Sequence, residues 1–366
     1  MAAVISATDS EVTKPINAVF QQQFLRQASP YLHYMMGTKP TALQKFGGAA
    51  TAKWRRVGAI TPSTTALSEQ TGNAAFFGGR DAVGVSNTDV TATLAKYGQA
   101  VVLTEEAENF NPKQQVSEII KAIAIAGGRS LNMLQRDIVD DNATVIYAGA
   151  AASTGALVSK ITLASIELAV MTLVTNSARP FMPMTKGDSR EGTAPILQSF
   201  WLVCHPYVAY DIMKMAGFKG VQTYAGQVSV APNEFGVIEG VGYAVRCVQC
   251  VDGTADANAG GSVTGTGLRS TGASVIDVYT TAIYGEDALG SVGLGSAHDD
   301  GIYSVEGMDS LPDSIKIIEK GFGSGGTSDP FDEIRTIAYK FWHAGAVLNS
   351  GWARVIKSGA TNVTGA

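Results

Sequence analysis

Residues 111–141, NPKQQVSEIIKAIAIAGGRSLNMLQRDIVDD, form the stretch that decides the fold. Asn111 can cap a helix and Pro112 suits its first position. Apolar side chains then recur at helical spacing, at Val116, Ile119, Ile120, Ile123, Leu131, Leu134 and Ile138. The pattern predicts one long amphipathic helix over about 112–141. Gly127 and Gly128 each cost about 1 kcal/mol against Ala in mid-helix, so we expect either a bend or a backbone packed closely against the helix.

The composition indicates a chain that meets other protein over much of its surface. Charged residues make up 16 % of the 366 residues, whereas roughly a quarter is typical of soluble domains. Residues 1–60 carry seven Lys and Arg against two Asp and Glu, a balance of +5, and the net charge of the whole chain is −5. The remainder therefore carries −10. A basic leading segment and an acidic body suggest head-to-tail association of copies, with scattered solvated charges as the alternative.

The cysteines and the hydropathy pattern bound the compartment. Cys204, Cys247 and Cys250 are too few for a disulfide framework, which favours a reducing compartment. No secretory segment follows Met1, and the most apolar run, 161–174, is short and contains a glutamate. We therefore expect no contact with a membrane.

Two segments near the start of the chain cannot bury their apolar groups alone. Residues 1–47 are polar and interrupted by Pro15, Pro30 and Pro40, and predict an extended arm with a short helix near 19–27. Over 48–98, two strand-like runs flank a Gly-rich tip and predict a long hairpin. Because a lone hairpin is marginally stable, we expect another copy to complete both segments. The residues expected at such contacts between subunits are Phe20, Phe24, Tyr31, Tyr34, Lys53, Trp54, Arg55, Arg56, Phe76 and Phe77.

The rest of the chain predicts one sheet-and-helix domain interrupted by another. A second helix is expected over 162–175, before the helix-breaking Pro180 and Pro183. Residues 180–310 then form an inserted domain of strands, in which 252–275 read as a flexible loop. The closing strands in 311–366 return to the first domain, whose earlier part is 99–179.

The motifs that suggest chemistry are weak. CVQC at Cys247 and Cys250 has no second ligand pair for zinc and reads as a buried structural pair. The Gly-rich loops at 265–270 and 290–296 have no phosphate-binding lysine. The basic KWRR at 53–56 could contact nucleic acid, but pairing with acidic groups on an adjacent copy is the preferred reading. We therefore predict no catalytic site, no cofactor and no metal.

The order of the expected elements resembles that of the major capsid proteins of tailed double-stranded DNA bacteriophages. The segment PNEFGVIEGVGYAVRCV at 232–248 is similar to the "GEIG, then G-V-R" pattern of one podophage-like capsid family. Residues 329–359, DPFDEIRTIAYKFWHAGAVLNSGWARVIKSG, are similar to the closing "W-K, then I-L-N, then R-I" pattern of that family. This chain departs from the first pattern in having Asn233-Glu234-Phe235-Gly236 and in placing Gly242-Tyr243 before the Val-Arg pair.

The resemblance implies an α+β fold of the Hong Kong 97 type, also called the Johnson fold. Its parts would be an N-terminal arm (1–47), an extended hairpin loop (48–98), a peripheral domain with a spine helix (99–179 and 311–366) and an axial domain (180–310). It also implies a non-enzymatic coat protein that forms pentamers and hexamers in an icosahedral virion shell.

The partners implied by the resemblance are other copies of the chain, packaged double-stranded DNA held by non-specific proximity, and a portal and a decoration or cement protein. Assembly would take place in the host cytoplasm. An encapsulin-like shell of a cellular nanocompartment is the alternative with the same fold. A nucleotide-binding enzyme built on the inserted domain is the alternative from another class.

Overall fold

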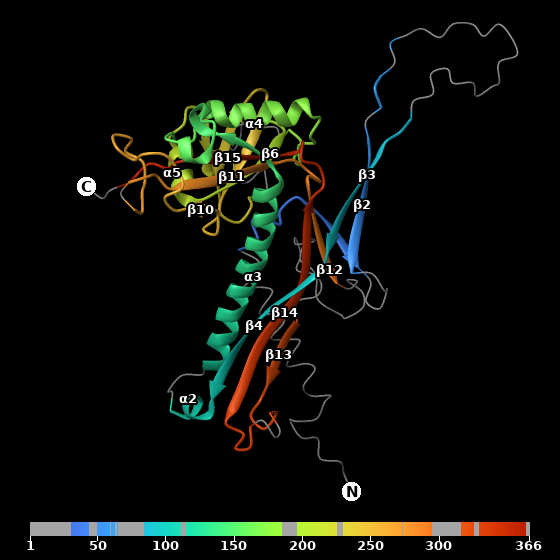
Figure 1. Cartoon of the computed structure of the whole chain (residues 1–366), viewed down its shortest axis with the longest axis vertical. Helices are drawn as coiled ribbons and strands as arrows, with labels where there is room; N and C mark the ends of the chain where they lie inside the picture. Colours follow the sequence, from blue (N-terminus) through green and yellow to red (C-terminus); the bar gives the residue numbers. More distant parts are fainter. Residues whose placement is uncertain are drawn as a thin grey trace, which may run out of the picture.

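Two bodies and a projecting hairpin make up the subunit (Figure 1). The computed structural model describes residues 31–43, 50–58, 60–62, 64, 84–110, 115–184, 196–224, 230–272, 274–294, 316–325 and 329–363. The upper body in Figure 1 is built on an eight-stranded sheet and the lower body on a five-stranded sheet. A separate two-stranded sheet leaves the side of the molecule between them.

Helix α3 (Gln115–Asn142) connects the two bodies and confirms the predicted long helix. Its apolar stripe, including Ile120, Ile123 and Leu131, packs against Tyr339 and Phe341 of the lower sheet. The helix continues through Gly127 and Gly128, both of which are buried. Residues 111–114, with the expected cap, lie outside the described residues. Among the described residues, no helix combines the length and the apolar character that a membrane span requires.

The lower body pairs strands that are far apart in the sequence. Its sheet has the order β1-β12-β14-β13, with β4 also paired to β14. The strands are β1 (Thr38–Leu43), β4 (Ala95–Thr104), β12 (Leu289–Leu294), β13 (Lys316–Lys320) and β14 (Ile334–Val347). The short helix α2 (Glu105–Asn109) follows β4 at the far end of this body. β14 and β4 pair antiparallel from His343↔Ala95 to Ile334↔Thr104, so one long strand gives the body its length.

The upper body encloses the larger core. Its sheet has the order β5-β15-β11-β6-β9-β8-β7, with β10 paired to β11. The strands are β5 (Thr144–Tyr147), β6 (Ser199–Cys204), β7 (Phe218–Gly220), β8 (Glu234–Gly240), β9 (Tyr243–Gln249), β10 (Ala255–Asp256), β11 (Val278–Tyr284) and β15 (Ala353–Ser358). Helices α4 (Leu163–Thr175) and α5 (Pro206–Met213) pack against this sheet. Short 3-10 turns lie at Ala148–Ala150, Thr154–Ala156 and Val221–Thr223.

The strand pairing divides the chain differently from the expected domain boundaries. β5, α4 and β15 belong to the upper body, although 99–179 and 311–366 were assigned to the other domain. β12 belongs to the lower sheet, although it lies within the expected insertion 180–310. The loop expected to be flexible at 252–275 contains β10, and the Asp277 carboxylate accepts hydrogen bonds from the backbone N–H groups of Asn258 and Thr271.

Three short connections link the two bodies. α3 passes into β5 after one residue, β11 is followed by β12 after residues 285–288, and β14 is followed by β15 after residues 348–352. Arg129 of α3 adds a side-chain link, since its Nε donates to Asp252 Oδ1 at 2.8 Å. The bodies are therefore joined at several points around their junction.

The described end of the predicted arm is folded into its own subunit. Residues 32–35 are buried: Leu32 and Met35 pack with α3 and the lower sheet, and Tyr34 packs with the upper sheet. The backbone N–H of Tyr34 donates to Asn132 Oδ1 at 2.9 Å, and the Tyr284 hydroxyl contacts the His33 carbonyl at 3.5 Å. We expected Tyr34 to contact another copy, but its side chain is 0 % exposed within its own subunit. The apolar groups of this segment find a core in the same chain, which the sequence pattern did not reveal.

Candidate functional site

The hairpin predicted over 48–98 is present and projects from the body (Figure 1). Strand β2 (Thr51–Val57) pairs antiparallel with β3 (Asn87–Thr93), from Thr51↔Thr93 to Val57↔Asn87. Its inner end packs on the lower sheet through Ala52 and Ala92. Farther out, Val57 is 62 % exposed and Val85 is 48 % exposed. The outer part therefore presents apolar side chains that its own subunit does not cover.

Trp54 fastens the hairpin to its own subunit. The indole Nε1 donates to Thr41 Oγ1 at 2.9 Å. The ring lies over Gly290 of β12, so closely that a Cβ on that glycine would be 2.9 Å from Trp54 Cζ2. Trp54 was predicted as a contact between subunits, and the structure gives it an anchoring role inside the subunit as well.

The neighbouring cations of the KWRR motif share one carboxylate. Lys53 Nζ lies 2.7 Å from Asp89 Oδ2, and Arg55 Nε lies 3.0 Å from Asp89 Oδ1. These hydrogen bonds, that of Arg55 first, lower the pKa of the Asp89 carboxyl to about 2. Arg56 is exposed and has no ion-pair partner among the described residues. The strand pair thus carries three cations against one carboxylate and keeps a positive charge.

A basic groove of about 420 Å³ lies between the hairpin and the upper body. Its walls include the four KWRR residues, joined by Lys39, Arg179 and Trp352 from distant parts of the chain. Asp287 is the one carboxylate among the described lining residues, and it lies 3.9 Å from Lys39 Nζ. We call this surface the hairpin groove. Its five cations and two tryptophans suit it to bind carboxylates or phosphates.

The structure brings together only part of the predicted contact set. Lys53, Trp54, Arg55 and Arg56 line the hairpin groove. Tyr31 is partly buried at the start of the described chain. Phe20, Phe24, Phe76 and Phe77 lie outside the described residues. The sequence did not single out Lys39, Arg179 or Trp352 for this surface, because no local pattern shows that three distant segments meet at the base of a hairpin.

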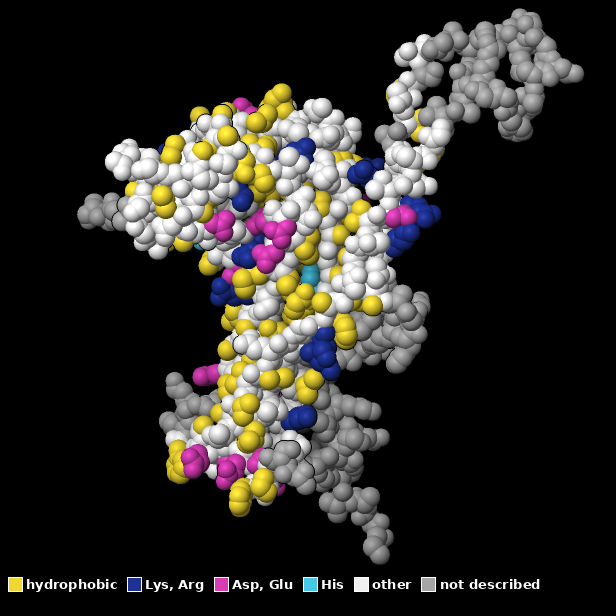
Figure 2. Space-filling view, viewed as in Figure 1, with side chains coloured by type: hydrophobic (Ala, Val, Ile, Leu, Met, Phe, Trp, Pro, Cys, Tyr) yellow, Lys and Arg dark blue, Asp and Glu magenta, His cyan; other side chains and the backbone are white. Residues whose placement is uncertain are grey.

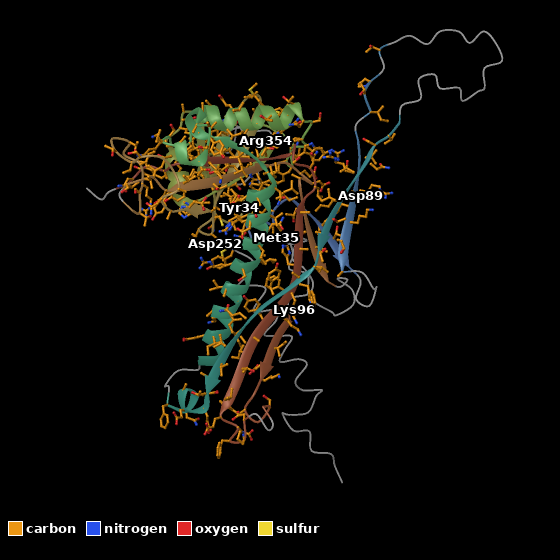
Figure 3. The ribbon with its side chains drawn as sticks, viewed as in Figure 1. Tyr34, Met35, Asp89, Lys96, Asp252 and Arg354 are labelled. Atoms are coloured by element: carbon orange, nitrogen blue, oxygen red, sulfur yellow. The ribbon has the colours of Figure 1, made fainter. Side chains whose placement is uncertain are left out.

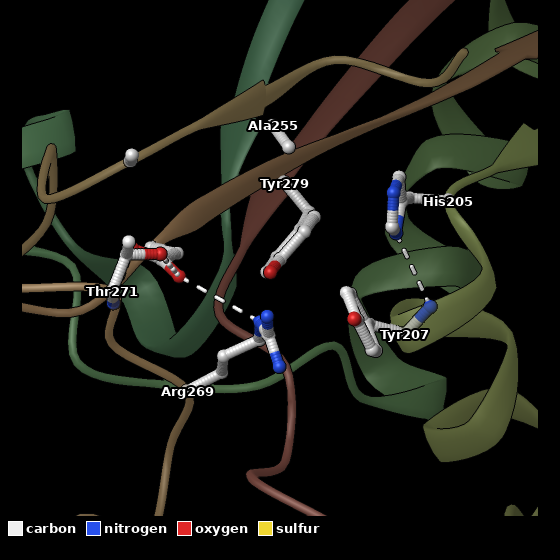
Figure 4. Close-up of a pocket in the computed structure, with 8 residues that line it drawn as sticks. His205, Tyr207, Ala255, Arg269, Thr271 and Tyr279 are labelled. Carbon is white, nitrogen blue, oxygen red and sulfur yellow. Dashed lines mark hydrogen bonds and ion pairs between the residues drawn. The ribbon is translucent and has the colours of Figure 1, made fainter. Parts of the chain in front are cut away.

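A second, smaller pocket of about 170 Å³ lies in the upper body (Figure 4). The Arg269 guanidinium lies 4.1 Å from the centroid of the Tyr207 ring and 3.8 Å from the Asp277 carboxylate. His205 Nδ1 accepts a hydrogen bond from the Tyr207 backbone N–H at 3.3 Å, and burial followed by the charge of Arg269 lowers the pKa of this imidazole. The polar groups already pair with one another, so the pocket offers no free nucleophile with a base beside it.

The cysteines and the motif residues are structural. Cys204, Cys247 and Cys250 are buried free thiols, as predicted for the CVQC pair, and burial raises the pKa of each. Within the described ranges, no group of His, Cys, Asp and Glu side chains has a metal-binding arrangement.

The segment 232–248, which carried the first resemblance, contains a buried ion pair. Arg246 Nε donates to Glu234 Oε1 at 2.8 Å, while the hydroxyl of Tyr224 donates to the same carboxylate at 2.7 Å. Both charged side chains are at most 2 % exposed. The acidic and basic positions of the motif are therefore partners across neighbouring strands, β8 and β9.

The chain thus combines a two-body α+β subunit with a projecting hairpin and a basic groove at the base of that hairpin. Residues 87–358 match the family model described as phage capsid protein. The chain belongs to the phage capsid protein family. No curated protein matches the chain.

Solved phage capsids show the same fold. The capsid of Ralstonia phage GP4 is 9 % identical, with a TM-score of 0.63 over 91 % of this chain and 90 % of that one. The capsid asymmetric unit of cyanophage Pam1 is 10 % identical, with a TM-score of 0.55 over 99 % and 95 %. The capsid of cyanophage P-SCSP1u is 12 % identical, with a TM-score of 0.51 over 88 % and 86 %.

These matches confirm the α+β fold of the Hong Kong 97 type and the identification as a major capsid protein of a tailed phage, which forms a shell. They do not favour an encapsulin-like compartment or a nucleotide-binding enzyme.

Proposed function

We propose that the chain assembles as pentamers and hexamers into the icosahedral shell of a virion, around double-stranded DNA. The observation that carries this proposal is the hairpin, whose outer part exposes Val57, Ile60 and Val85 beyond the reach of its own core. A two-stranded hairpin gains stability when a third surface covers it. Since the hairpin leaves one side of the subunit, it would cover a different surface on the neighbour. Such heterologous contacts form a ring when the rotation between neighbouring copies closes on itself.

The role is structural rather than catalytic. Within the described pockets, the titratable groups do not converge as a nucleophile and a base. Assembly takes place in the host cytoplasm, and the finished shell would accept a portal and a decoration or cement protein. DNA would lie against it without sequence-specific contacts.

The test is assembly of the purified protein. Negative-stain electron microscopy and analytical ultracentrifugation should show closed shells, with five- and six-fold units in class averages. A monomer under every condition of salt, pH and concentration would refute the proposal.

A variant in which an Asn-Gly turn replaces residues 59–85 is the matched control. Val57 pairs with Asn87, and the Gly58 N–H donates to the Ser86 carbonyl at 2.7 Å. A two-residue turn can therefore join Gly58 to Ser86 without changing the strand register. This shortened variant should fold, as judged by circular dichroism, and fail to form shells. Normal shells from the shortened variant would show that the hairpin is not what joins the copies.

A further inference from the structure

The C-terminal turn of α3 carries an excess of negative charge. The helix ends in the sequence DIVDDN, with no basic residue in its last turn. Because the C-terminal end of a helix dipole is itself negative, aspartates there are unfavourable. Asp137 and Asp141 are also four residues apart, where like charges repel along a helix. The folding of the subunit alone therefore does not account for this arrangement.

The two aspartates remain accessible. Asp137 pairs with the adjacent Arg136 at 2.6 Å, and its side chain is still 56 % exposed. Asp141 is exposed and has no ion-pair partner among the described residues. Figure 2 shows Asp and Glu side chains gathered where α3 meets the upper body. We call Asp137 and Asp141 the α3 acidic pair.

The hairpin groove has the opposite charge. Of its five cations, Lys39 lies near Asp287, and Lys53 and Arg55 pair with Asp89. Arg56 and Arg179 have no ion-pair partner among the described residues. In Figure 2, Lys and Arg side chains gather along the hairpin and the adjoining edge of the upper body. Arginine forks bind carboxylates with two parallel hydrogen bonds, so the groove is complementary to an exposed pair of aspartates.

The two surfaces lie where neighbours in a ring would meet. The hairpin and α3 lie on opposite sides of β14, and both the groove and the C-terminal end of α3 adjoin the upper body (Figure 1). In Figure 3, Asp89 lies on the flank that carries the hairpin, and Asp252, which binds α3, lies on the opposite flank below the upper body. Neighbouring copies in a ring meet through such opposite flanks.

We propose that the hairpin groove of one copy receives the α3 acidic pair of the next copy in the ring. This assignment rests on the proposed function, since it requires that copies form rings. Arg56 and Arg179 would be the main partners of Asp137 and Asp141. Arg55 and Lys53 are already engaged by Asp89 and would set the positive potential around the contact.

Charge reversal and its compensation test the contact. D137K/D141K and R56E/R179E should each lower the yield of shells at least tenfold at low salt. The combined variant, which restores opposite charges across the contact, should recover the yield to within about threefold of the wild type. Circular dichroism and thermal melting of the unassembled subunits check folding. D137K/D141K should melt no lower than the wild type, because lysines suit the end of a helix.

Crosslinking provides a readout independent of yield. The native thiols Cys204, Cys247 and Cys250 are buried. In a D141C/R56C variant, a thiol reagent should therefore react with the two introduced surface cysteines. A short bis-maleimide should convert its assembled rings into a ladder of covalent multimers, and neither single variant should give one.

The outcomes are separable. If the wild type forms no rings or shells, the proposed function fails. If the wild type assembles but the reversed variants assemble equally well, or the combined variant does not recover, the contact is refuted. If R56E/R179E forms normal shells that retain less DNA, the groove binds nucleic acid and the contact is likewise refuted. The absence of a crosslinked ladder in assembled shells also overturns it.

Discussion

The buried ion pair between Glu234 and Arg246 allows a quantitative test of how the upper body is held together. The Glu234 carboxylate accepts from Arg246, from the Tyr224 hydroxyl and from the Ala231 N–H at 2.9 Å. Arg246→Met removes the cation and leaves a buried carboxylate with only two neutral donors. Breaking a buried pair in this way costs about 3–5 kcal/mol. We therefore expect the free energy of unfolding to fall by this amount.

The double variant E234L/R246M distinguishes an ion-pair effect from lost packing. It removes both charges and leaves the Tyr224 hydroxyl and the Ala231 N–H unpaired, at about 1–3 kcal/mol each. The double variant also avoids the cost of removing two charged groups from water, which offsets part of that loss. The double variant should therefore lose clearly less than the sum of the two single variants.

Urea unfolding of unassembled subunits, followed by tryptophan fluorescence, gives these free energies. Trp201 reports locally, because its ring centroid lies 4.9 Å from the Arg246 guanidinium. Arg55→Met is the matched control, since its pair with Asp89 is exposed to solvent and should contribute little to stability. A loss below 1 kcal/mol for Arg246→Met, or strict additivity in the double variant, would refute the reasoning.

Three further predictions concern pH and packing. Burial lowers the pKa of His343 from 6.5 to about 4. The unfolded state therefore binds the proton first, and the free energy of unfolding should fall by up to about 3 kcal/mol as pH drops from 6.5 to 4. H343L should abolish this pH dependence in urea titrations. Burial raises the pKa of Asp140 from 3.8 to about 6, so stability should fall by about 1–2 kcal/mol as pH rises from 4 to 6, and D140N should flatten this part of the same titration. Gly290→Ala places a Cβ 2.9 Å from Trp54 Cζ2 and 3.0 Å from Leu348 Cδ2, which should cost about 1–3 kcal/mol in thermal melts, whereas G84A, with nothing within 4 Å of its Cβ, should be neutral.

Local patterns in the sequence predicted individual elements well. The apolar spacing from Ile119 to Ile138 identifies α3, and alternation on either side of a polar tip identifies β2 and β3. The helix expected over 162–175 is α4, and Thr162 caps it by accepting from the Ser165 N–H. These signals are local, because helix periodicity and turn chemistry act over a few residues.

Pairing between distant strands could not be read from the same patterns. β1 lies parallel to β12, about 250 positions away, and nothing near Thr38 or Leu289 specifies that partner. β14 and β15 are separated by five residues, yet one completes the lower sheet and the other the upper sheet. A boundary drawn where composition changes therefore misplaces both β12 and β15.

For the same reason, the sequence revealed only part of the candidate site. KWRR is visible as a basic run, and alternation places it on a strand. Its pairing with Asp89 follows from the hairpin register Arg55↔Asp89, which the sequence leaves open. Lys39 and Arg179 join the groove only through tertiary structure. No sequence pattern shows that His343 is buried with neither ring nitrogen hydrogen-bonded among the described residues.

The three connections between the two bodies make the subunit resist bending at their junction. Any swing of one body would have to distort the end of α3, residues 285–288 and residues 348–352 at the same time. A force applied near α2 is therefore transmitted through α3 and β14 to the upper sheet, because no single hinge can bend to relieve it. In a shell under internal pressure, strain would then concentrate at the contacts between neighbouring copies, and the strength of those contacts would decide when the shell breaks.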